Sequence, residues 1–168
     1  MASTSSSSSS AQMTYPRRNY YDVFVSFRGK DTRFNFTDHL FASFLRKGIV
    51  AFRDDTNLNK GESIAPELLR AIQASQVYVV VFSKNYATST WCLRELECIL
   101  ECVQLSGKRV LPIFYDVDPS EVRYQKGSYG EAFLKHEQRF QRDSETLQRW
   151  SEDLTQVANL SGWDLRDK

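Results

Sequence analysis

Four short runs of β-branched and aromatic residues recur along the chain, each followed by a stretch with helical spacing. The runs cover Tyr20–Phe27, Ile49–Phe52, Val77–Phe82 and Val110–Tyr115. Continuous apolar runs of this length are typical of strands buried on both faces of a parallel sheet. Proline cannot donate to a strand ladder, so Pro112 predicts that the fourth run lies near an edge or a bulge.

Amphipathic stretches between and after these runs predict helices. The first carries a stripe of Phe36, Leu40, Phe41, Phe44 and Leu45 and ends at Gly48. The others are predicted at Glu62–Ser75, Trp91–Leu105, Tyr129–Arg142 and Glu145–Leu160. The polar stretch Asp116–Tyr129 predicts short helical turns, and periodicity alone places no fifth strand.

Alternation of strands and helices predicts an α/β fold with a parallel sheet and helices on both faces. Ligands of such folds bind outside the carboxyl ends of the strands. The loops to inspect are therefore Arg28–Arg33, Asp54–Gly61, Ser83–Trp91 and Asp116–Arg123.

Composition narrows the class of protein. The chain has 168 residues, enough for one domain, and 22 basic against 21 acidic residues give a net charge of +1. This balance provides no overall field to attract nucleic acid or an anionic membrane. Three cysteines in one short segment, Cys92, Cys98 and Cys102, indicate reduced thiols in a reducing compartment. A cytoplasmic or nuclear location is expected. Their spacing matches no zinc motif, so no metal is expected.

The first 18 residues form a Ser-rich leader that is predicted to be disordered, because its composition cannot bury enough apolar surface. Arg17 and Arg18 also suit a plastid transit peptide, although a plain tail is favoured. Residues 19–166 are then expected to form the folded domain.

Several common active sites are absent from the sequence. No Gly-x-Gly-x-x-Gly, Walker or Gly-x-Ser-x-Gly motif is present. Ser83 and Lys84 follow the third run, where a receiver domain would need an aspartate. Cys92 has no base nearby in sequence, which favours a buried structural thiol over a nucleophile.

Glu95 is the more informative candidate. It follows Trp91 by four residues, so both side chains lie on one side of the same predicted helix near its start. A carboxylate beside an aromatic plane suits a ligand with sugar hydroxyls and a flat ring. The alternative is an ordinary solvated glutamate in a first helical turn, and local pattern alone favours that alternative.

Four segments resemble the signatures of plant TIR domains: Tyr21–Arg33, Ser89–Leu96, Pro112–Ser120 and Gly162–Leu165. The resemblance implies a flavodoxin-like fold with a central parallel sheet of five strands. It also implies the N-terminal part of a TIR-type nucleotide-binding leucine-rich-repeat immune receptor.

The same resemblance implies NAD⁺ glycohydrolase activity that is switched on when TIR domains assemble, with NAD⁺ or NADP⁺ as substrate and no cofactor. Glu95 occupies the family's catalytic position. Cleavage of the nicotinamide–ribose bond builds positive charge on the ribose, which a carboxylate can stabilise.

By resemblance, the substrate pocket would include seven further residues. These are Arg28, Gly29, Arg33, Asp54, Gly61, Ser83 and Trp91. Trp91 would stack on a flat ring, and Asp54–Gly61 matches the mobile BB-loop of the family.

The resemblance also implies self-association through the first and last helices, with Asp38, His39 and Trp150 as the expected residues. Other TIR domains would be partners, as would lipase-like immune signalling proteins. Lys30 stands where relatives usually carry Glu, and Asp38 where many carry Ser. The added charge of Asp38 argues against strong self-association of this domain alone.

Two other functions remain open on the sequence. One is a non-catalytic scaffold for receptor assembly, against which the presence of Glu95 argues. The other is processing of nucleic acid to cyclic nucleotides, for which the neutral net charge gives no support.

Overall fold

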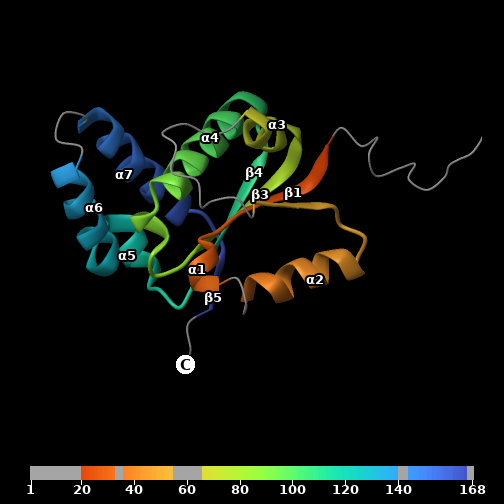
Figure 1. Cartoon of the computed structure of the whole chain (residues 1–168), viewed down its shortest axis with the longest axis horizontal. Helices are drawn as coiled ribbons and strands as arrows, with labels where there is room; N and C mark the ends of the chain where they lie inside the picture. Colours follow the sequence, from red (N-terminus) through yellow and green to blue (C-terminus); the bar gives the residue numbers. More distant parts are fainter. Residues whose placement is uncertain (1–19, 33–35, 55–65, 140–143, 166–168) are drawn as a thin grey trace, which may run out of the picture.

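The chain folds around a five-stranded, fully parallel sheet (Figure 1). The computed structural model describes residues 20–32, 36–54, 66–139 and 144–165. The strands are β1 (Tyr21–Ser26), β2 (Ala51–Arg53), β3 (Ser75–Phe82), β4 (Arg109–Tyr115) and β5 (Trp163–Leu165). Their spatial order is β2-β1-β3-β4-β5, which is the flavodoxin-like order and confirms the predicted fold class.

Seven α-helices and one 3₁₀-helix lie within the described residues. They are α1 (Gly29–Thr32), α2 (Asp38–Arg46), α3 (Pro66–Ala74), η4 (Tyr86–Thr88), α4 (Thr90–Ser106), α5 (Pro119–Tyr124), α6 (Gly127–Arg139) and α7 (Ser144–Ala158). The start of α4 is fixed by the Ser89 side chain, which accepts a hydrogen bond from the backbone N–H of Cys92. Gly107 ends the same helix at φ 76°, in the left-handed region that glycine favours.

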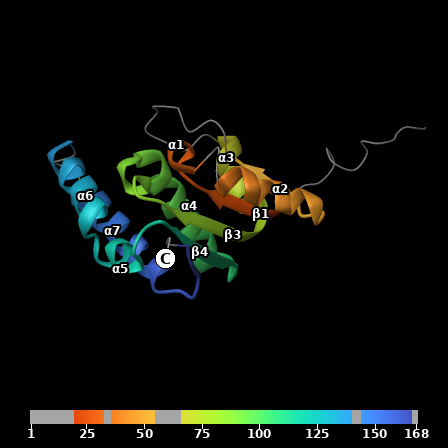
Figure 2. The ribbon, with the colours of Figure 1, turned by 90° about the horizontal axis from the view of Figure 1, so that it is seen from below.

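Alternating side chains of the strands divide the core into two unequal parts. Phe24, Val80 and Phe114 face the larger part, which α3, α4, α5, α6 and α7 complete. Val25, Val81 and Ile113 face the smaller part, against which α2 packs. Both views show α5, α6 and α7 together at one end of the molecule, away from α2 (Figure 1 and Figure 2).

Local structure departs from the sequence predictions after β1 and at the end of α3. Gly29–Thr32 forms the one-turn helix α1 instead of a loop. The third strand begins at Ser75, inside the region predicted as helix, because its hydroxyl donates to the carbonyl of Ala71 and closes the end of α3.

Pro112 lies in β4, next to the edge strand β5, and is paired with Val80 of β3. The pairing of β4 with β5 begins only at Ile113, so Pro112 precedes that ladder. A Cβ atom added at Gly162 would lie 2.2 Å from the Pro112 carbonyl oxygen. This close approach explains why glycine precedes β5, a strand too short for its periodicity to predict.

Within the described residues, none of the helices combines the length and the apolar character that crossing a bilayer requires.

Leu100→Ala is expected to lower the free energy of unfolding by about 2–5 kcal/mol, because Leu100 is buried in the larger core beneath α4. Leu105→Ala provides the matched control on the same helix: Leu105 is 90% exposed, so the change should stay within about 0.5 kcal/mol. Urea unfolding at equilibrium measures both values, and equal losses would contradict the assignment of the buried face of α4.

Candidate functional site

The candidate site lies where β1 and β3 end side by side. The strand order reverses between these two neighbours, since β1 leads to β2 on one side and β3 leads to β4 on the other. Such a switch point is where ligands of doubly wound sheets bind. Ser26 ends β1, Ser83 follows β3, and α4 carries Glu95 to the same edge.

Glu95 is a buried carboxyl group at this edge, with 2% of its surface exposed. The Ser26 hydroxyl donates a 2.7 Å hydrogen bond to its Oε1. Its Oε2 is buried and has no hydrogen-bond partner among the described residues. The alternative of a solvated glutamate in a first helical turn is therefore wrong.

Burial raises the pKa of Glu95 well above its usual range, and the neighbouring Asp54 carboxyl raises the pKa further. The hydrogen bond from Ser26 and the nearby indole N–H of Trp91 act in the opposite direction and favour the charged form. An ionised Glu95 would thus be a poorly solvated anion, which interacts strongly with any positive charge brought close to it.

Asp54 and Trp91 form a second buried pair next to Glu95. The indole Nε1–H of Trp91 donates to Asp54 Oδ2 at 2.8 Å. The two residues are 5% and 4% exposed, Trp91 and Asp54 respectively. The first turns of α4 are therefore buried on more than the one face that an amphipathic stripe predicts. Stacking of Trp91 on a ligand ring stays a prediction.

A polar cluster links β3 to the loop after β1. Ser83 donates to Asp31 Oδ2 at 2.5 Å, and the backbone N–H of Asn85 donates to the same oxygen at 2.9 Å. Arg28 lies 3.6 Å from Asp31, and its buried Nε has no hydrogen-bond partner among the described residues. Gly29 is buried at the start of α1. The structure thus brings Arg28, Gly29 and Ser83 to one edge.

Two of the predicted substrate-binding residues, Arg33 and Gly61, lie outside the described residues. Conversely, sequence reasoning missed Ser26, Asp31 and Tyr86. Ser26 ends a predicted strand at the carboxyl edge, and this position was the only signal that could have singled it out.

Cys92 is a buried thiol, as predicted. Its Sγ lies 3.7 Å from the carbonyl oxygen of Phe27, and burial raises its pKa far above the ordinary thiol range. A thiol that stays protonated is a poor nucleophile. No group of three or more potential metal ligands occurs in the part of the chain that the structure describes.

The predicted self-association residues do not share one surface. His39 is exposed on α2, and Asp38 pairs with Arg53 at 2.6 Å. Trp150 is 1% exposed, and its indole N–H donates to Glu97 at 3.2 Å. Because α2 and α7 pack on different parts of the core, the prediction of a joint surface with Trp150 is wrong.

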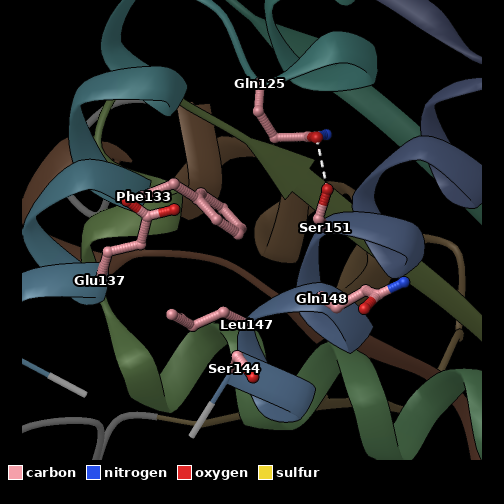
Figure 3. A pocket seen from close by; sticks show the side chains of 7 residues that line it. All are labelled: Gln125, Phe133, Glu137, Ser144, Leu147, Gln148 and Ser151. Carbon is pink, nitrogen blue, oxygen red and sulfur yellow. Dashed lines mark hydrogen bonds between the residues drawn. The ribbon is translucent and has the colours of Figure 1, made fainter. Parts of the chain in front are cut away.

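A cavity of about 500 Å³ lies apart from this site, between α6 and α7 (Figure 3). Phe133 and Leu147 point into it from the two helices. Its polar groups are already satisfied in part, since Ser151 donates to Gln125 at 2.6 Å and the Gln125 amide donates to backbone carbonyls. The cavity therefore offers few groups to orient a polar ligand.

Glu95→Gln is expected to raise the thermal midpoint at pH 7, by about 2–4 °C per kcal/mol gained in a protein of this size. The folded-state pKa is raised, so the wild type loses stability as pH rises from the unfolded value of about 4.3 through the folded value. The advantage of the variant should therefore vanish below about pH 4.

Calorimetry across pH measures this difference. Glu101→Gln, on the exposed side of the same helix, is the matched control and should show no comparable gain. A Glu95→Gln protein that is less stable than wild type at neutral pH would contradict the burial of an unfavourable charge.

Comparison with known proteins identifies the family of the chain. The family model described as TIR domain matches residues 20–168. Disease resistance protein RPV1 of Vitis rotundifolia is 56% identical over 99% of the chain, and TMV resistance protein N of Nicotiana glutinosa is 52% identical over 100%. The chain spans only 12% and 14% of the lengths of these relatives.

A solved structure also matches closely. It is that of the TIR domains in the activated Roq1 resistosome directly recognizing the pathogen effector XopQ, with a TM-score of 0.82 and 54% identity. The match covers 88% of this chain and 89% of that one. The chain therefore belongs to the TIR domain family and is similar to the TIR domains of plant disease resistance proteins.

Proposed function

We propose that this domain is an NAD⁺ nucleosidase that cleaves the nicotinamide–ribose bond when self-associated, as part of a plant immune receptor. One observation carries the proposal: at the switch point of the sheet, Glu95 holds one buried carboxylate oxygen that has no hydrogen-bond partner among the described residues. A buried polar atom without a partner is costly, and such atoms in native structures call for a functional reason.

The chemistry follows from the charge that develops on the substrate. As the bond to nicotinamide breaks, positive charge grows on the ribose, as in other glycosyl transfers. An ionised Glu95 stabilises that charge, and it does so strongly because water is excluded around it. Nicotinamide departs as a neutral molecule, so a second carboxylate is not needed to protonate it.

Groups next to Glu95 suit the rest of a dinucleotide. Arg28 is partly exposed at the same edge and can donate to a pyrophosphate. Trp91 and Asp54 lie next to Glu95, and Asp54 is the first residue of the segment that matches the BB-loop. Addition of water to the ribose carbon would give ADP-ribose, and addition of the adenine ring of the same molecule would give a cyclic ADP-ribose-type product. These products would signal defence and cell death through lipase-like partners in the cytoplasm or nucleus.

Assembly is included in the proposal because TIR domains are present together in the Roq1 resistosome, to which this chain is similar. His39 is exposed on α2 and is available for such a contact. The neighbouring Asp38 is paired with Arg53 at 2.6 Å, which offsets its negative charge.

Glu95→Ala is expected to reduce nicotinamide release from NAD⁺ by about 100-fold or more, because it removes the anion opposite the developing charge. Release is followed by chromatography with concentrated protein on a crowding surface. Glu101→Ala, on the exposed side of α4, is the control and should retain wild-type activity. Equal rates for all three proteins would rule out the catalytic role of Glu95, and no release by any of them would favour a scaffold.

Specific activity is expected to rise with protein concentration if neighbouring domains complete the site. His39→Ala should shift this rise to higher concentration by weakening the α2 contact, whereas Leu105→Ala, exposed on α4, should leave it in place. Activity per molecule that stays constant over a hundredfold dilution would contradict assembly dependence.

A further inference from the structure

A chain of buried hydroxyl groups ends on the candidate catalytic carboxylate. The Tyr86 hydroxyl lies 2.8 Å from Ser26 Oγ, and Ser26 Oγ lies 2.7 Å from Glu95 Oε1. Ser26 is 1% exposed and Tyr86 is fully buried, so water does not compete for these hydrogen bonds. Neither Ser26 nor Tyr86 has a role in the proposed cleavage so far.

The direction of the hydrogen bonds follows from the acceptor at one end. An ionised carboxylate can only accept, so the single Ser26 proton points to Glu95. Ser26 then accepts from Tyr86 at 2.8 Å, and the single Tyr86 proton is shared with the more distant carbonyl oxygen of Cys92, which accepts at 3.2 Å. Tyr86 thus holds Ser26 in the rotamer in which its hydroxyl donates to Glu95.

Rigid elements hold both donors in place. Ser26 lies in β1, whose ladder partner at that position is Val80 of β3. Tyr86 lies in η4, and its ring packs edge-on against Phe82 at a centroid distance of 5.2 Å. A donor fixed in the middle of a sheet can hold an acceptor within a few tenths of an ångström, which active-site groups require.

The two oxygens of Glu95 are consequently unequal. Oε1 is held by Ser26, while Oε2 is buried with no partner among the described residues. We propose that Ser26 and Tyr86 are positioning residues, which fix Oε1 so that Oε2 faces the ribose of the substrate. This inference rests on the proposed NAD⁺ cleavage and adds two residues from outside the segment that carries Glu95.

Ser26→Ala tests the proposal by removing the donor to Glu95. It should lower kcat for nicotinamide release by about tenfold or more with KM within about twofold of wild type, since misplacement of a reacting group mainly costs the chemical step. Tyr86→Phe keeps the ring packing and should have a smaller effect of the same type, because it frees Ser26 to rotate.

The pH profile separates positioning from a general loss of structure. The Ser26 hydrogen bond lowers the pKa of Glu95, so its loss raises that pKa and shifts the acidic limb of kcat to higher pH in Ser26→Ala. Activity of this variant should recover in part at alkaline pH, which a merely unstable protein would not show.

Two matched variants remove equally buried hydroxyl groups that do not reach Glu95. Ser75 donates to the Ala71 carbonyl and Tyr78 to the Ile72 carbonyl. Ser75→Ala and Tyr78→Phe should therefore keep the wild-type kcat and pH profile. A Ser26→Ala protein that behaves like Ser75→Ala in both measurements would overturn the positioning role.

A second measurement keeps the inference independent of turnover. Carbon-13 NMR of labelled glutamate side chains follows the ionisation of Glu95 in wild type, Ser26→Ala and Ser75→Ala. A titration that moves to higher pH in Ser26→Ala alone supports the hydrogen bond even if no nicotinamide is released, in which case the proposed cleavage fails and the local role of Ser26 stands. Identical titrations in all three proteins would overturn that role.

Discussion

The parallel pairing of β1 with β3 is the constraint on which the rest of the structure depends. It aligns Ser26 with Val80 and brings the ends of two strands, far apart in sequence, to the same edge. The helix after β3 then returns across this edge and places Glu95 against Ser26. Without that register Glu95 would lose its Ser26 donor, and its burial would be more costly.

Stability and chemistry compete at the start of α4. Trp91, Leu93 and Leu96 of this helix are core residues, yet the same turns carry Glu95. The core residues fix the helix so firmly that a charged group can be held where water is scarce. Apolar packing of neighbouring residues thus offsets the cost of burying the Glu95 carboxyl group.

The sequence predicted the sheet well because its strands are buried on both faces, which leaves continuous apolar runs. It could not predict β5, whose three residues include the exposed Trp163 and Leu165 and are positioned by the contact of Gly162 with Pro112. Local pattern also favoured a solvated Glu95, because burial of a carboxylate is decided by partners elsewhere in the chain. The family resemblance identified Glu95, but Ser26, Asp31 and Tyr86 appear only once the tertiary contacts are known.

The central place of β1 and β3 has a consequence for local opening of the molecule. Both strands have a neighbour on each side, whereas β2 and β5 are three-residue edge strands. Amide protons of β1 and β3 would then exchange with solvent only when the whole domain opens, while those of the edges exchange earlier. Glu95 is hydrogen-bonded to Ser26 in this central part of the sheet, so local opening of the edge strands would leave that hydrogen bond in place.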